Sequence, residues 1–205
     1  MAVHGDLIHA VVMTLNPLRN KPRGPENVKR LSAAARVALD ISAKLSGIAH
    51  FVPRKDINGV PLPAGSVFWS ISHTEQCVAG VVAPQPVGID LEKIGPVSDD
   101  LWSSAASEEE WNLASAGDPS CFFRYWTAKE AVLKATGAGL AGLRDCIVTG
   151  VTDAEQIRLS YRGRNWTVYQ RRIADGRFPH IAAVTGGGSG IVWHIRAEGN
   201  HGVTG

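Results

Sequence analysis

The sequence predicts an α+β fold, and three observations support this prediction. The chain has 205 residues, of which 44% are hydrophobic and 20% charged, which fits one globular domain or two small halves sharing a core. Two long segments carry apolar residues at helical spacing. Short apolar segments separated by Gly and Pro follow each of them. A long helix followed by strands therefore occurs in both halves of the chain.

The first half begins with a predicted strand over 7–13, which ends at Asn16-Pro17. A basic loop over 19–30 follows. Apolar residues at helical spacing then predict a helix over 26–45. Turn residues come next. They precede three predicted strands, over 67–72, 77–82 and 87–92.

The second half begins with predicted helices. Ser107 is a predicted N-cap, because three glutamates follow it in the first turn. Asp118 and Pro119 are suited to begin the main helix, and Gly137 to end it. The remaining strands are predicted over 146–152, 156–161, 165–173, 180–184 and 191–195.

Charge and cysteine content narrow the functional classes. The net charge of +2 does not require nucleic acid, but it fits a polyanionic small ligand or an acidic protein partner. The three cysteines form no CxxC pair, so neither a disulfide framework nor a zinc site is expected. No leader and no apolar run of about 18 residues is found. We therefore expect a cytoplasmic protein with reduced thiols and no membrane attachment.

The predicted main helix of the second half carries charges at a spacing that could be functional. Trp126, Glu130 and Lys134 are four residues apart and share one face. Taken alone, the last two are more simply an exposed ion pair, worth about 0.3–0.5 kcal/mol.

A second acidic pair precedes this helix. Asp90 and Glu92 are two residues apart on a predicted strand, so their side chains share a face. A cation would offset the repulsion between them, and oxygen ligands favour Mg²⁺. The alternative is an exposed strand end, where the two acids pair with Lys93 or a neighbouring arginine. His73, after another strand, could donate to a phosphate or simply bond to a turn.

Taken together, these segments resemble the 4′-phosphopantetheinyl transferases of the surfactin-synthetase-activating type. The Gly-Ile-Asp-x-Glu motif of that family is matched by residues 88–92, and its Trp-x-x-Lys-Glu-x-x-x-Lys motif by residues 126–134. Three shorter matches are Ser72-His73-Thr74, Glu110-Trp111 and Gly139-Leu140.

The resemblance implies two similar α+β halves related by a pseudo-two-fold axis, each a long helix packed on a small antiparallel sheet. We expect these halves to span 1–100 and 101–197, with a flexible tail over 198–205. The active site would lie between them. The length fits the two-half members of the family, which are usually monomers.

The resemblance also implies the reaction, namely Mg²⁺-dependent transfer of 4′-phosphopantetheine from coenzyme A to a serine of an apo carrier protein, with release of 3′,5′-ADP. Asp90, Glu92 and Glu130 would hold Mg²⁺. Glu130 would be the base, and Lys134 would act with it on the phosphates. The other expected coenzyme A contacts are Lys21, Arg23, Arg36, Ser72, His73 and Lys129, among which Lys129 ranks lower because it points about 100° away from Glu130.

The expected partner is the carrier protein, an acidic helical bundle serving fatty acid or secondary metabolite synthesis. Trp102, Glu110 and Trp111 are candidates for its docking surface, although core packing is the simpler role for the two tryptophans. One alternative is a non-catalytic module that binds coenzyme A or a carrier protein. Another is a Mg²⁺-dependent phosphotransferase acting on a nucleotide, against which the lack of a phosphate loop counts.

Overall fold

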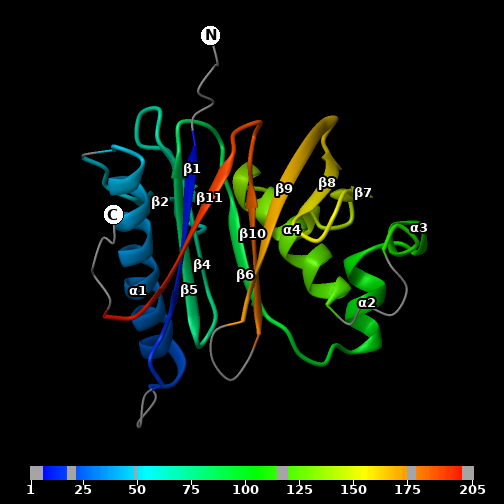
Figure 1. The fold of residues 1–205 in the computed structure, drawn as a ribbon, viewed down its shortest axis with the longest axis horizontal. Coiled ribbons are helices and arrows are strands. Elements are labelled where there is room, and N and C mark those ends of the chain that lie inside the picture. The colour runs from blue at the N-terminus through cyan, green and yellow to red at the C-terminus, as the bar shows by residue number, and fades with distance from the viewer. Residues whose placement is uncertain (1–6, 18–21, 49, 115–119, 175–178, 200–205) are drawn as a thin grey trace.

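The computed structural model describes residues 7–17, 22–48, 50–114, 120–174 and 179–199, and contains two main sheets (Figure 1). The first has the strand order β11-β1-β5-β4. Its central strand β1 pairs in parallel with β11 and antiparallel with β5, which pairs antiparallel with β4. The strands are β1 (Ile8–Thr14), β4 (Phe68–His73), β5 (Cys77–Ala83) and β11 (Ile191–Ala197).

The second sheet has the order β6-β10-β9-β8-β7, and all its neighbours are antiparallel. Its strands are β6 (Ile89–Lys93), β7 (Ile147–Val151), β8 (Gln156–Tyr161), β9 (Arg164–Ile173) and β10 (His180–Thr185). The edge strand β6 also contacts β4 and β5 of the first sheet.

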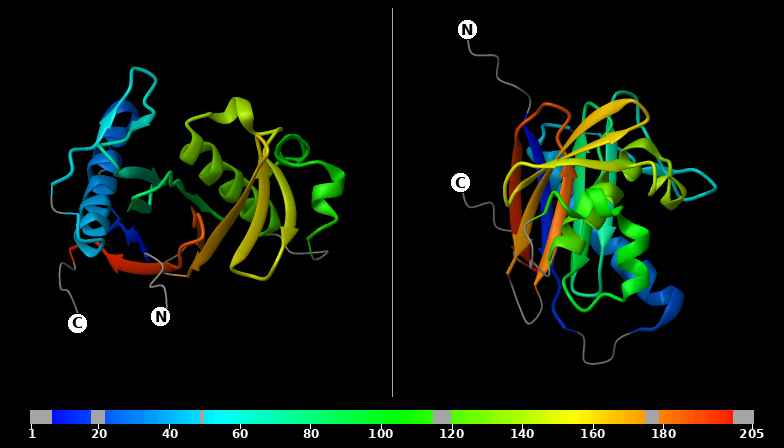
Figure 2. Two further views of the ribbon diagram at one scale, coloured as in Figure 1. Left: turned by 90° about the horizontal axis from the view of Figure 1, so that it is seen from above. Right: turned by 90° about the vertical axis from the view of Figure 1, so that its right-hand side faces the viewer.

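One long helix packs on each sheet. Helix α1 (Gly24–Leu45) contacts β1, β4 and β5, and helix α4 (Cys121–Thr136) contacts β6, β9 and β10. Seen from above, the two helices are separated, with strands between them (Figure 2). The shorter elements are the strands β2 (Arg54–Lys55) and β3 (Pro61–Leu62), the helices α2 (Asp99–Ala105) and α3 (Glu108–Trp111), and the 3₁₀ turn η1 (Leu140–Gly142).

Each long helix approaches its sheet closely at one glycine. A Cβ atom on Gly80 of β5 would lie 2.4 Å from the backbone nitrogen of Leu39 in α1. A Cβ atom on Gly88, just before β6, would lie 1.9 Å from the carbonyl oxygen of Ala131 in α4. Backbone atoms cannot move aside as a flexible side chain can, so both contacts require glycine. The second contact places α4 directly against the acidic strand.

Most predicted elements are confirmed, with shifts of one or two residues at their ends. The predicted helix over 26–45 begins at Gly24, and the main helix of the second half begins at Cys121. The predicted cap at Asp118 and Pro119 lies outside the described residues. The short strands β2 and β3 were not predicted.

The prediction of two antiparallel sheets is wrong at one edge. Strand β11 runs parallel to β1, although 176 residues separate Thr14 from Ile191 and the two strands share no turn. Parallel pairing needs a long crossover connection, which a local turn signal does not reveal. Strand β6 lies in the predicted 1–100 half, yet its ladder partner is β10. Glu198, expected in the tail, donates its backbone N–H to Thr14.

None of the helices in the described part of the chain is long and apolar enough to cross a membrane.

Candidate active site

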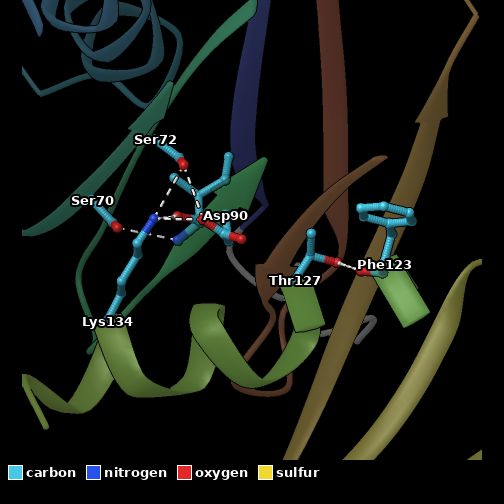
Figure 3. Close-up of polar contacts among 7 residues, drawn as sticks. Ser70, Ser72, Asp90, Phe123, Thr127 and Lys134 are labelled. Atoms are coloured by element: carbon cyan, nitrogen blue, oxygen red, sulfur yellow. Dashed lines mark hydrogen bonds and ion pairs between the residues drawn. The ribbon is translucent and has the colours of Figure 1, made fainter. Parts of the chain in front are cut away.

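The candidate site forms where α4 meets strands β4 and β6. The Lys134 ammonium lies 2.6 Å from Asp90 Oδ1 and donates to Ser72 Oγ at 3.1 Å and to the Ile89 carbonyl at 3.3 Å. The Ser72 hydroxyl donates to the same Asp90 oxygen at 2.9 Å. Figure 3 shows the lysine reaching from the helix toward these groups. Three elements therefore converge on one carboxylate.

The start of strand β6 is held by side chains from both sheets. The backbone N–H of Ile89 donates to Ser70 Oγ at 3.1 Å, and the N–H of Gly88 donates to Thr185 Oγ1 at 2.9 Å. All of these groups are buried, where an unmade hydrogen bond costs about 1–3 kcal/mol. These bonds fix the backbone that presents Asp90 to the site.

Glu92 and Glu130 lie within electrostatic reach of Asp90. Burial, followed by repulsion from Asp90, raises the pKa of Glu92 to about 7, while Lys134 and a hydrogen bond from Trp126 act in the opposite direction. Burial, and then Asp90, also raises the pKa of Glu130, against the effect of Lys134. The predicted stripe of Trp126, Glu130 and Lys134 thus faces the acidic strand.

These carboxylates fit an oxygen-preferring cation such as Mg²⁺ in their chemistry. Asp90 Oδ2 is buried and has no hydrogen-bond partner, which is unusual for a carboxylate oxygen. Its other oxygen, Oδ1, contacts the Lys134 ammonium, which is also bonded to the oxygen atoms of Ser72 and Ile89. As placed, no three His, Cys, Asp or Glu side chains of the described residues are grouped tightly enough to hold a metal ion.

A cleft of about 190 Å³ lies beside this cluster. Glu130 and Lys134 line one wall, and residues of β4 and of the hairpin formed by β2 and β3 line the others. The lining is otherwise largely apolar, and its members from these elements include Lys55, Val60, Pro61, Ile71 and Leu133. The cleft could therefore take a ligand that is apolar in part and anionic at one end.

Two basic residues, Lys55 and Lys134, line the cleft, and Arg36 lies within electrostatic reach of Lys55. Arg36 of α1 is exposed, as is Lys55 of β2. Desolvation, followed by repulsion from Arg36 and Lys134, lowers the pKa of Lys55. Desolvation is also the main cause that lowers the pKa of half-buried His73, with Lys134 and Lys55 adding to it. His73 is thus a neutral hydrogen-bonding group near neutral pH, whereas the other three are cations.

The structure does not bring Lys129 to this site. Its side chain is only 1% exposed, and its ammonium lies 2.7 Å from Glu110 Oε1. The same carboxylate accepts the backbone N–H groups of Ser107 and Val148. Lys129 differs from Glu130 by one residue, or about 100° around the helix, so it faces α3 and β7 instead of β6.

Other predicted residues are scattered. Arg23 is exposed just before α1 and is not among the residues that line the cleft. Lys21 lies outside the described residues. Trp111 stacks on Tyr125 with ring centroids 4.7 Å apart and also contacts Trp102, so both tryptophans belong to an aromatic cluster. Core packing was therefore the better prediction for these two.

Lys55 and Ser70 contribute to the site but were not predicted from the sequence. The signal for Lys55 was the adjacent Arg54-Lys55 pair before the Asn58-Gly59 turn, but nothing in a single sequence places that hairpin beside α4. Ser70 and Ser72 alternate with an apolar residue on β4, and this alternation was available as a hint that both hydroxyls share a face.

Comparisons with known proteins give matches to one enzyme family. Residues 86–182 match a model of the 4′-phosphopantetheinyl transferase superfamily. The chain is similar to the 4′-phosphopantetheinyl transferase HetI of Nostoc sp., with 32% identity over 148 residues that cover 68% of this chain and 61% of the relative.

Two further relatives match over shorter stretches. The transferase gsp of Aneurinibacillus migulanus is 32% identical over 91 residues, which cover 42% of this chain and 38% of the relative. The transferase Sfp of Bacillus subtilis is 32% identical over 77 residues, which cover 36% of this chain and 34% of the relative.

The chain spans less than two thirds of the length of each of these relatives. The matched region 86–182 contains strand β6 with Asp90 and Glu92, and helix α4 with Glu130 and Lys134. This match, the similarity to several transferases and the two motifs around Asp90 show that the chain is similar to the 4′-phosphopantetheinyl transferase superfamily over the region that carries the candidate site.

Proposed function

We propose that this protein transfers 4′-phosphopantetheine from coenzyme A to a serine hydroxyl of an apo acyl or peptidyl carrier protein, in a Mg²⁺-dependent reaction that releases 3′,5′-ADP. The observation that carries the proposal is the ion pair between Asp90 and Lys134, which lines the cleft with Glu130, while Glu92 and Glu130 both lie within electrostatic reach of Asp90. Carboxylates and an ammonium group together provide ligands for a cation and a positive charge for phosphate.

Asp90, Glu92 and Glu130 would hold Mg²⁺, and the unpartnered Oδ2 atom of buried Asp90 supports this assignment. When bound, the ion would supply charge neutralisation at the pyrophosphate of coenzyme A. Because phosphoryl transfer depends mainly on charge stabilisation and alignment, the fixed backbone of β6 contributes by holding these oxygens in place. Ser72 would orient Asp90 through its 2.9 Å hydrogen bond.

Glu130 is the proposed base. The serine of the carrier protein must lose its proton as its oxygen attacks phosphorus, while the bond to the 3′,5′-ADP oxygen breaks. Glu130 lines the cleft, so its carboxylate would be within reach of that proton. Lys134 would stabilise negative charge on the transferred phosphate, and His73 would donate a hydrogen bond to a phosphate oxygen.

The proposed pseudo-two-fold relation of the two halves has topological support. A strand, a long helix and a later antiparallel pair occur in both, with β1-β5-β4 and β6-β10-β9 as the corresponding orders in the sheets. In this comparison β6 would begin the second unit. All three cysteines are buried and none forms a disulfide, which supports the proposed cytoplasmic location.

The first test is direct. The protein is incubated with coenzyme A, Mg²⁺ and an apo carrier protein, and the carrier is examined by mass spectrometry for the phosphopantetheine adduct. Asp90→Ala and Glu130→Ala should each lose transfer while keeping the wild-type circular dichroism spectrum. Asp145→Ala, which removes an exposed carboxylate outside the cleft, is the matched control and should retain full activity.

Transfer by both variants at the wild-type rate would refute the assignment of the carboxylates. Binding of coenzyme A by the wild-type protein, without transfer to any apo carrier protein, would instead support the alternative of a non-catalytic binding module.

A further inference from the structure

Two histidines contact each other across the parallel edge of the first sheet. Nδ1 of His9 on β1 lies 2.9 Å from Nε2 of His194 on β11, although the two residues are 185 positions apart in the sequence. Their ring centroids are 5.2 Å apart, and the ring planes are inclined by 36°. In the ladder His9 is opposite Val192 and His194 is opposite Val11, so the two histidines are diagonal neighbours. The proposed reaction uses neither of them.

Both histidines lie on the face of the sheet against which α1 packs. Val11, two positions after His9 and therefore on the same face, belongs to the core cluster formed with α1. Trp193, the neighbour of His194, packs against the cluster on the opposite face, so His194 is directed to the side of α1. The Ser42 hydroxyl of α1 donates to the His9 carbonyl at 2.6 Å. Strand pairing and the helix thus fix the backbone that carries the pair.

The pair is uncharged near neutral pH, which is the form that binds metal ions. Burial, followed by His9 and then Arg196, lowers the pKa of His194. A neutral imidazole carries one N–H and one lone pair, so one facing nitrogen of this pair donates and the other accepts. If the shared proton moves to the outer nitrogen of its own ring, two lone pairs face each other at the same distance. A cation between them would stabilise this arrangement.

The distance between the two nitrogens fits two ligands of one metal ion. Zn–N bonds are about 2.0–2.1 Å long, so two imidazoles at an angle of about 90–110° place their nitrogens about 2.8–3.4 Å apart. The observed 2.9 Å lies within this range. Imidazole is a ligand for Zn²⁺, Ni²⁺ and Cu²⁺, whereas Mg²⁺ prefers oxygen atoms. The pair would therefore select a different class of ion from the carboxylates around Asp90.

We propose that His9 and His194 form a binding site for a divalent transition-metal ion of the class that prefers imidazole, such as Zn²⁺ or Ni²⁺. Within the described ranges no third His, Cys, Asp or Glu joins them to form a group that could hold a metal ion, so water would complete the coordination. Because β11 is an edge strand and β1 is its neighbour in the sheet, the ion would tie the last strand of the chain to the sheet. This site is separate from the proposed transfer reaction and does not depend on it.

The test is isothermal titration calorimetry with Zn²⁺ as the probe, near neutral pH and in saturating Mg²⁺, which occupies the proposed carboxylate site. The wild-type protein should bind one Zn²⁺ ion per chain at the pair. His9→Ala and His194→Ala should each weaken this binding by about tenfold or more, because changes even to the outer partners of metal ligands cost about 10–100-fold in affinity.

A second measurement follows stability. An ion that binds only the folded state shifts the unfolding equilibrium, so Zn²⁺ should raise the urea midpoint of the wild-type protein. It should leave the midpoints of His9→Ala and His194→Ala unchanged. Unfolding in EDTA shows whether each variant is folded, and His9→Gln or His194→Gln replaces an alanine variant that is not.

His50→Ala is the matched control, because it removes an exposed histidine outside the pair. This variant should bind Zn²⁺ as the wild-type protein does and show the same rise of the urea midpoint.

The inference is overturned if the wild-type protein shows no saturable binding of Zn²⁺, in which case the two histidines form a hydrogen bond only. It is also overturned if both pair variants bind Zn²⁺ as tightly as the wild-type protein, because the ion would then lie at other groups. Transfer of phosphopantetheine is measured with Mg²⁺ and without Zn²⁺, so either result would leave the proposed function standing.

Discussion

Lys129→Met would remove the cation from the buried ion pair with Glu110 while nearly preserving the shape of the side chain. The exposed fractions of the two side chains are 1% and 4%, and the ammonium–carboxylate distance is 2.7 Å. Breaking a buried pair by removing one partner costs about 3–5 kcal/mol, because a charge is left without compensation. We expect a loss near the lower end, about 3 kcal/mol, because two backbone N–H groups still donate to Glu110.

The assay is a double-mutant cycle in guanidinium chloride, monitored by circular dichroism at pH 7. Glu110→Gln alone leaves a buried ammonium without its carboxylate and should cost a similar amount. The double variant should be more stable than the sum of the single losses predicts, by at least about 2 kcal/mol. Losses below about 1 kcal/mol, or strictly additive losses, would refute the argument that this pair is a buried structural contact.

Activity measurements on two lysine variants distinguish a lysine with a structural role from a lysine of the active site. Lys129→Met, measured under conditions where it is folded, should keep the wild-type KM for coenzyme A. Lys134→Met, five residues further along α4 and 28% exposed, should lose transfer with a smaller loss of stability. A raised KM for Lys129→Met would instead support the prediction that Lys129 contacts the coenzyme.

The remaining predictions concern pH and packing. Because the folded-state pKa of Glu92 is raised from 4.5 to about 7, the folded protein binds more protons than the unfolded chain in this range, and metal-free stability should fall as pH rises through it. In EDTA at pH 8, Glu92→Gln should therefore be about 1–2 kcal/mol more stable to unfolding than wild type, after allowance for solvent screening. The difference in stability should be small at pH 5, and saturating Mg²⁺ should reverse its sign. Equal urea midpoints of the two proteins at both pH values would contradict this prediction. Gly88→Ala should destabilise by about 3 kcal/mol or more, because its Cβ would lie 1.9 Å from the Ala131 carbonyl oxygen, and thermal unfolding within a degree or two of wild type would contradict it.

Local patterns in the sequence are sufficient to predict the helical face that carries the site. Positions four apart on a helix share a face, so spacing alone groups Trp126, Glu130 and Lys134. The tertiary packing directs this face toward Asp90. The same geometry explains why Lys129, one residue earlier than Glu130, turns to another part of the molecule.

Pairings between distant segments cannot be predicted in this way. Strand β11 is expected from its local pattern, but its parallel partner β1 lies at the other end of the chain. Lys55 lies 79 residues before Lys134, and only the packing of the hairpin against α4 brings both to one cleft. Local spacing contains no information about which of several sheet edges or helix faces will meet.

The sequence alone determined the order of the elements, the helical face that carries Glu130 and Lys134, and the resemblance to a transferase family. These follow from backbone periodicity and from short motifs whose members are near one another in the chain. The tertiary structure decided which charges meet. It pairs Lys134 with Asp90, encloses Lys129 with Glu110, and adds Lys55 to the cleft, because burial and long-range packing select the partner of each charged group.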